Sequence, residues 1–278
     1  MEENMSILMR FPDFKYKAFT LSYDDGATAD NRLCDLFYSY GVKATFNLCT
    51  SLIGKPDRLT EQDIKERIIE RGFELACHGD RHTSLALVDN GVAMLDTVKG
   101  RSELEERFGI IVKGMAYANG SFDKDTVEML RLAGIEHCRT TVSTGKFTMP
   151  DEPLAMPATC KHTSPDLMKL AREFIETPLR SYYWAKTPRL FYVWGHAFEF
   201  DNDNNWEVME ELLKYVSGRE DVWYATVGEI ISYQTAFKSL RQSMDGKIIH
   251  NPSAIPVYVH YHGKDIVIEP GKTVTLEG

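Results

Sequence analysis

Two adjacent carboxylates form the first group of side chains in this sequence that could carry out chemistry. Asp24 and Asp25 stand side by side and are followed by Gly26. Adjacent carboxylates repel each other unless a cation or a proton separates their roles. A metal ion could therefore bind one carboxylate and leave the other free to act as a base. Asp-Asp-Gly is also common in simple turns, so this segment alone leaves both interpretations open.

Three histidines form the second group. His78 and His82 are four residues apart, and on a helical turn this spacing places both imidazoles on one face, where they can bind one metal ion. Two unrelated surface histidines would give the same spacing. His196 directly follows Gly195 at the end of an apolar run, and taken alone it is more typical of a buried core histidine.

Together these groups are the minimum set for metal-assisted hydrolysis. One of the two carboxylates, with His78 and His82, could bind the ion, while the other carboxylate and His196 remain as a base and an acid. One carboxylate and two histidines leave coordination positions open for water and substrate. Zinc is the first expectation for the metal, and iron, cobalt or nickel would also suit these ligands.

The elements that must position these residues alternate along the chain. Short β-prone runs, such as residues 17–22, 73–77 and 190–195, are followed by amphipathic segments of helical length. Seven or eight such units in series predict an α/β fold, a distorted (β/α) barrel of parallel strands. The polar groups then follow strands, at the face where parallel barrels place their active sites. We expect the barrel to span residues 1–245, and a β-hairpin extension at 246–278 to pack on the same domain.

Composition excludes several classes of protein. The chain has 278 residues and a net charge of −9, which disfavours binding to nucleic acid or to an anionic membrane. No apolar stretch approaches the roughly eighteen residues of a spanning helix. The five cysteines are widely spaced and contain no C-x-x-C pair, which is typical of reduced thiols in a cytoplasmic protein. The C-terminal hairpin could cover a sheet edge or form a homo-oligomer contact.

In their order along the chain, these segments resemble the motifs of the polysaccharide deacetylase family, the NodB-homology or carbohydrate esterase family 4 enzymes. The resemblance covers residues 17–235 and includes a glycine-containing loop after the β-prone run at 114–118. It implies a distorted (β/α) barrel that removes an N-acetyl or O-acetyl group from an acetylated saccharide. It also implies a role for each polar residue: Asp24 as base, His196 as general acid, and Asp25, His78 and His82 as metal ligands.

The chain departs from the family pattern at one arginine. The family's Arg-x-Pro-Tyr-Gly stretch corresponds to residues 116–120, Ala-Tyr-Ala-Asn-Gly, so the arginine expected to pair with the base is missing. Arg139, at the end of the next predicted strand, could take its place. A backbone N–H near Asn119 could still donate to the oxyanion, because a main-chain donor does not depend on the side chain.

A second departure concerns the acid. The family's Asp-x-x-Asp-Trp motif, which orients the acid histidine, is absent from residues 139–145, and Glu199 or Asp201 could replace it. Aromatic side chains could contact the saccharide by stacking on its C–H faces, although a barrel core also uses many aromatics. The candidates are Tyr117, Tyr182, Tyr183, Trp184, Trp194 and Trp206.

Two alternative functions remain open. A relative that binds carbohydrate without catalysis would explain the missing arginine. A metal-dependent sugar isomerase or lyase would use the same ligands but would need a second proton-transfer group, most naturally a lysine. No lysine stands at a predicted strand end beside these motifs, which disfavours the isomerase or lyase.

Overall fold

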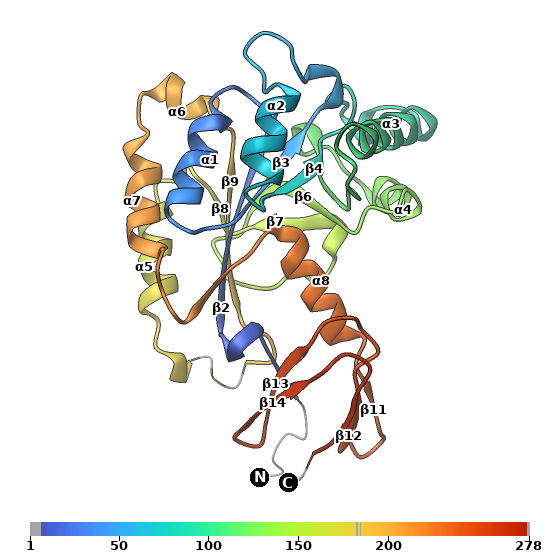
Figure 1. Cartoon of the computed structure of the whole chain (residues 1–278), viewed down its shortest axis with the longest axis vertical. Helices are drawn as coiled ribbons and strands as arrows, with labels where there is room; N and C mark the ends of the chain where they lie inside the picture. Colours follow the sequence, from blue (N-terminus) through green and yellow to red (C-terminus); the bar gives the residue numbers. More distant parts are fainter. Residues whose placement is uncertain (1–6, 182, 184, 277–278) are drawn as a thin grey trace.

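The structure is a computed structural model that describes residues 7–181, 183 and 185–276. Its main part is a parallel β-sheet curved into a nearly closed barrel, with helices around the outside (Figure 1). Within the described residues, eight strands lie in the order β7 (Met156–Ala158), β6 (His137–Ser143), β5 (Gly114–Ala116), β4 (Glu74–Cys77), β3 (Ala44–Leu48), β2 (Lys17–Asp24), β9 (Arg189–Gly195) and β8 (Cys160–Lys161), and β10 (Val222–Tyr224) pairs with β2. The predicted distorted (β/α) barrel is confirmed.

Central strands of this sheet are buried on both faces. All eight residues of β2 and all five of β3 are buried, as expected for parallel strands that have helices or core on either side. Every pairing in this sheet is parallel. The carboxyl ends of the strands therefore meet at one end of the barrel, which is the end that positions the candidate site.

Helices follow most strands and bury one face each. In α7, the buried residues Met209, Leu212, Leu213 and Val216 recur at the spacing of a helix that packs on a core. One helical segment begins as α2 and continues as a π-helix at Ile64–Ile69. The helices are α1 (Asp30–Ser39), α2 (Glu61–Asp63), α3 (Asn90–Phe108), α4 (Lys124–Leu132), α5 (Leu167–Glu176), α6 (Phe198–Asp203), α7 (Glu207–Val216) and α8 (Val227–Lys238), with short 3₁₀ turns at 12–14, 50–52, 85–87, 118–120, 153–155 and 179–181.

Two small antiparallel sheets form the C-terminal extension, at the end of the barrel away from the carboxyl ends of the strands (Figure 1). One contains β1 (Leu8–Arg10), β13 (Val257–Tyr261) and β14 (Lys264–Ile268), and the other β11 (Arg241–Gln242), β12 (Ile248–His250) and β15 (Thr273–Thr275). The predicted hairpin is β13–β14, whose turn residues His262 and Gly263 both have positive φ. Tyr233 of α8 ties the extension to the barrel: its hydroxyl donates to the Arg10 carbonyl and accepts from the Tyr258 N–H.

Two further observations concern the part of the chain that the structure describes. None of its helices combines the length and the apolar character needed to cross a membrane. The five cysteines are all buried and carry free thiols.

Candidate active site

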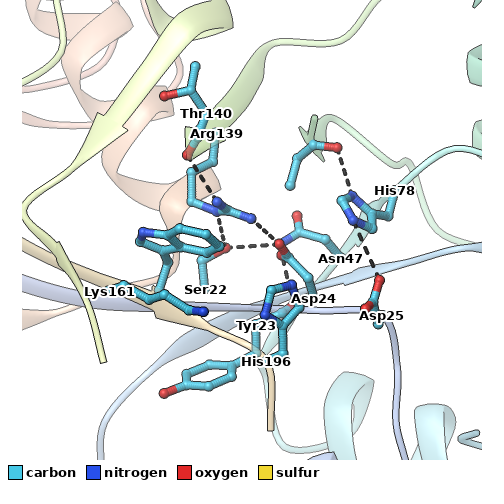
Figure 2. Close-up of polar contacts among 12 residues, drawn as sticks. Ser22, Tyr23, Asp24, Asp25, Asn47, His78, Arg139, Thr140, Lys161 and His196 are labelled. Atoms are coloured by element: carbon cyan, nitrogen blue, oxygen red, sulfur yellow. Dashed lines mark hydrogen bonds and ion pairs between the residues drawn. The ribbon is translucent and has the colours of Figure 1, made fainter. Parts of the chain in front are cut away.

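Residues far apart in the sequence meet at the carboxyl ends of three strands. Asp24 is the last residue of β2 and Asp25 follows it, His78 follows β4, and His196 follows β9. Arg139 reaches the same place from β6 (Figure 2). The position agrees with the general rule that parallel barrels build active sites from these strand ends.

Asp25, His78 and His82 form a cluster that could hold a metal ion. The Asp25 Oδ1 atom lies 3.6 Å from Nε2 of His78 and 3.6 Å from Nε2 of His82. All three donor atoms lie within 4.8 Å of one another. Two donors that each lie about 2.1 Å from a tetrahedral zinc ion are about 3.4 Å apart. The spacing therefore suits one shared cation.

The state of each donor also fits a divalent cation. Asp25 Oδ1 is buried and has no hydrogen-bond partner among the described residues, and such an orphaned oxygen is costly unless something compensates for it. His78 Nδ1 lies 2.8 Å from the carbonyl oxygen of Ala116. Because a carbonyl only accepts, Nδ1 carries the proton and Nε2 presents its lone pair to the cluster. Burial lowers the pKa of His78, which favours the neutral form that a metal ligand requires.

The segment from His78 to His82 is a loop and not a helical turn. Gly79 has φ 80° and His82 has φ 58°, and two left-handed residues are incompatible with a continuous helix. The prediction that both histidines share a helical face is therefore wrong, although their imidazoles still converge, with ring centroids 4.8 Å apart. Asp96 of α3 holds the loop, because its carboxylate accepts from the N–H groups of Asp80 and Arg81 and from the Thr83 hydroxyl, at 3.2, 3.0 and 2.8 Å respectively.

Asp24 is a buried carboxylate with a partner on each oxygen. Asn47 donates its amide N–H to Oδ1 at 2.8 Å, and the Arg139 guanidinium contacts Oδ2. Burial alone would raise the pKa of Asp24, but the positive charge of Arg139, with smaller contributions from His78 and His196, lowers the pKa below its usual value of 3.8. Asp24 is therefore ionised near neutral pH, as a base must be.

Arg139 occupies the place expected for the missing arginine. In the β5–β6 pairing, Ala116 lies directly beside Arg139, so the charge has moved by one strand at the same level of the sheet. Arg139 also donates to the Thr140 carbonyl at 2.9 Å, and its guanidinium lies 4.3 Å from the centroid of the Trp194 ring. These contacts direct it at Asp24 (Figure 2).

His196 is half-buried on the other side of Asp24. Its Nδ1 lies 3.4 Å from Oε1 of Glu199, and its side chain is 22% exposed. Burial alone would lower the pKa of His196, but the Glu199 carboxylate and the charges of Asp24 and Asp25 raise it above 6.5. A histidine with a raised pKa retains its proton near neutral pH and can act as an acid. Of the two predicted partners, Glu199 contacts His196, whereas Asp201 accepts from the Trp206 indole at 2.8 Å.

Three polar residues near this site were absent from the sequence prediction. Asn47 comes from the end of β3, and Lys161 and His162 come from β8 and the residue after it. Lys161 contacts Glu199, and His162 lies 3.1 Å from the other oxygen of the same carboxylate. Lys161 is the last residue of β8, so the prediction that no lysine stands at a strand end beside the motifs is wrong. In the sequence, Lys161 and His162 appear only as a basic pair beside a short threonine-rich run. That pattern predicts neither a strand nor a functional site.

The predicted substrate contacts are mostly buried. Tyr117, Trp194 and Trp206 are 1%, 6% and 7% exposed, so none presents an open stacking face in this structure. Tyr117 donates to the Leu154 carbonyl, and Trp206 packs on Phe200. Tyr183 contacts His260 of the extension. Tyr182 and Trp184, which the sequence also suggested as substrate contacts, lie outside the described residues.

Asn119 stands in the turn after β5. It has φ 57° and its side-chain amide donates to the Ser84 hydroxyl at 2.9 Å. Its side chain faces solvent, and the turn borders the loop that contains His78 and His82. The backbone of this turn remains the candidate donor to an oxyanion.

Comparisons with known proteins agree with this architecture. A family model for polysaccharide deacetylase matches residues 12–138. A putative polysaccharide deacetylase from Mycobacterium smegmatis shares 18% identity over 85% of this chain and 96% of its own, with a TM-score of 0.62. The allantoinase PuuE shares 13% identity over 80% of this chain and 91% of its own, with a TM-score of 0.58. At these identities the structural matches show the fold.

Two other results complete the comparisons. This chain spans 61% of the length of the Streptococcus pyogenes deacetylase PplD, a structure with acetate, at 20% identity over 49% of this chain and a TM-score of 0.46. Comparison with curated proteins gives no match. Fold and family model together define a deacetylase-type (β/α) barrel. More specifically, residues 12–138 match the family model for polysaccharide deacetylase, and the resemblance drawn from the motifs is confirmed.

Proposed function

We propose that this protein is a metal-dependent hydrolase that removes an acetyl group from an N- or O-acetylated saccharide. The observation that carries the proposal is the cluster of Asp25, His78 and His82, with donor atoms within 4.8 Å of one another, directly beside the ionised Asp24. The polysaccharide deacetylase segment at residues 12–138 supports an acetylated saccharide as the substrate.

Asp25, His78 and His82 would hold the metal. When bound, a divalent cation would polarise the acyl carbonyl and lower the pKa of a water molecule at its open positions. Zinc is the first choice for two imidazoles and one carboxylate, and iron, cobalt or nickel would also suit them. The orphaned Oδ1 of Asp25 and the free Nε2 of His78 favour such an ion in this place.

The protein's own residues would move two protons. Asp24 accepts a proton from the attacking water as the water oxygen bonds to the acyl carbon. Arg139 and Asn47 hold the Asp24 carboxylate in place during this step. His196 donates a proton to the leaving amine or alkoxide as its bond to the acyl carbon breaks, and acetate is released. A backbone N–H near Asn119 would donate to the oxyanion.

The non-catalytic alternative loses its main support. It rested on the arginine that is missing at position 116, and Arg139 supplies a guanidinium to Asp24 from the neighbouring strand. A base without a counter-charge would have been typical of a degenerate site. The pairing of Arg139 with Asp24 instead favours a working base.

Metal analysis and acetate release together test the proposal. The purified protein is analysed for bound metal, loaded with zinc, and incubated with acetylated chitooligosaccharides and acetylated xylan. We expect Asp24→Asn to retain the metal and lose about 10²- to 10⁴-fold in rate, and His78→Ala to lose both metal and activity. His250→Ala, in the extension, is the matched control and should change neither. Full activity in Asp24→Asn, or no acetate from any substrate, would refute the proposal.

A further inference from the structure

His162 is a buried histidine that the proposed mechanism does not use. It follows β8 and is 2% exposed. Its ring is stacked between Tyr23, at a centroid distance of 5.6 Å, and Phe200, at 4.1 Å. A purely apolar side chain would fill this space as well, so the polar contacts of the ring decide what it could do.

Both ring nitrogens of His162 have a polar neighbour. Nδ1 lies 3.1 Å from the Tyr23 hydroxyl, and Nε2 lies 3.1 Å from Oε2 of Glu199. Because an ionised carboxylate only accepts, Nε2 must carry the proton, and Nδ1 then accepts from the Tyr23 hydroxyl. One neutral tautomer suits both contacts, of which the one between Nε2 and Glu199 is a close electrostatic approach without hydrogen-bond geometry. Burial lowers the pKa of His162, which keeps the ring in that neutral form.

Glu199 is consequently held on both oxygens. Oε2 faces His162, while Oε1 contacts Lys161 and lies 3.4 Å from Nδ1 of His196. Nδ1 of His196 faces Oε1 without hydrogen-bond geometry, and the negative charge of the carboxylate favours a proton on this nitrogen. The orientation of His196 therefore depends on a carboxylate that His162 and Lys161 fix.

The residue before His196 is fitted to His162. A Cβ atom on Gly195 would lie 2.0 Å from Nδ1 of His162, which no side chain can avoid without displacing the ring. The backbone N–H of His162 also donates to the Trp194 carbonyl at 2.8 Å. The two strand ends that carry His162 and His196 are thus packed directly against each other, without a side chain at position 195 between them.

We propose that His162 is a positioning residue that fixes Glu199 and, through it, the orientation and tautomer of His196. This inference rests on the proposed function, in which His196 protonates the leaving group. A positioning role and a packing role predict different effects on the two proton-transfer steps. Loss of His162 should harm the protonation of the leaving group and spare the attack of water.

Two substrates separate these steps. An N-acetylated chitooligosaccharide releases an amine that must be protonated, whereas 4-nitrophenyl acetate releases a phenolate that needs no proton. In His162→Phe, which keeps a stacked ring, we expect kcat for the amide to fall about 10- to 100-fold, the range of outer-shell partners. The rate with 4-nitrophenyl acetate should change by less than about threefold, since the leaving group needs no acid.

Matched variants sharpen the comparison. His162→Gln can still donate to Glu199 and accept from Tyr23, so it should recover much of the amide rate. Glu199→Gln should lower the amide rate preferentially, as His162→Phe does, and it provides the same test if His162→Phe does not fold. Thr159→Val removes a buried hydroxyl from the same segment, where it donates to the Lys146 carbonyl, and should leave the ratio of the two rates unchanged.

A measurement without turnover completes the test. In ¹⁵N NMR spectra recorded at a pH above the raised pKa of His196, the neutral ring should carry its proton on Nδ1 in the wild type and become a mixture of tautomers in His162→Phe. Equal losses with both substrates, together with an unchanged His196 tautomer, would overturn the inference and leave His162 as a packing residue. If the wild type hydrolyses neither substrate, the proposed function fails, and the NMR comparison still decides whether His162 positions His196.

Discussion

Loss of the buried pair between Arg139 and Asp24 should be among the most costly changes at this site. The two side chains are 1% and 3% exposed. Arg139→Met retains an unbranched side chain that can still lie on Trp194, but it removes the guanidinium. The Asp24 carboxylate then stays buried with Asn47 as its remaining side-chain donor.

The size of the effect follows from that burial. Removing one partner of a buried ion pair typically costs about 3–5 kcal/mol, because the other charge is left uncompensated. An unfolding entropy of about 2.1 cal/mol/K per residue gives roughly 0.6 kcal/mol/K for this chain. Arg139→Met should therefore lower Tm by about 5–9 °C at neutral pH.

The effect should also depend on pH. In the wild type the pKa of Asp24 lies below 3.8, so its stabilising contribution is complete above the ordinary carboxyl pKa and is lost as the pH falls through the lowered value. In Arg139→Met burial dominates and raises the pKa of Asp24. Protonation then relieves the buried charge, so the difference in unfolding free energy between variant and wild type should shrink from pH 7 to pH 4.5.

Urea unfolding, followed by tryptophan fluorescence at both pH values, measures these differences. Arg67→Met is the matched control, because Arg67 is 33% exposed and pairs with Asp35, which is 54% exposed; it should cost less than about 1 kcal/mol. The double variant Arg139→Met/Asp24→Asn should cost less than the sum of its single changes. A loss below about 1 kcal/mol that is equal at both pH values would refute the reasoning.

Three further predictions concern neighbouring groups. Asp96→Ala should weaken zinc binding about 10- to 100-fold by freeing the loop of the two histidine ligands, as measured by chelator competition; unchanged affinity at unchanged Tm would contradict this role. In metal-free protein, an NMR titration should find the pKa of His196 above 6.5, and Glu199→Gln should lower it; no change on that substitution would exclude Glu199 as the cause. Burial raises the pKa of Glu74, but the contacts with His137 lower it overall, so its contribution to stability is lost as pH falls through that lowered pKa. The difference in unfolding free energy between Glu74→Gln and the wild type should therefore be largest at neutral pH and vanish in acid, and a difference that grows in acid would contradict this sign.

Periodic elements of the fold were predictable from sequence. The strand at 190–195 and the helix ending at Val216 carry strong apolar patterns, and both are present within one or two residues. The strand β8 was not predicted, because it has only two residues and its burial comes from its neighbours β7 and β9. Lys161 and His162 were missed for the same reason.

Predictability of the site divides in a similar way. Asp25, His78 and His82 stand in short segments whose strand ends could be inferred, so their convergence was foreseeable. The pairing of Arg139 with Asp24 depends on the register between β5 and β6. The sequence placed Arg139 on the next predicted strand but did not determine that register. The prediction of an exposed stacking surface is wrong for Tyr117, Trp194 and Trp206, which are buried, because residue type does not distinguish a buried aromatic ring from an open one.

The sideways shift from Ala116 to Arg139 has a consequence for recognising distant homologues. A counter-charge can change strands and still arrive at the same point, because residues in register on neighbouring parallel strands lie at the same level of the sheet. A linear signature that demands arginine at the first position would discard such chains as inactive. Screening for a guanidinium within reach of the aspartate, whichever strand supplies it, would retain them.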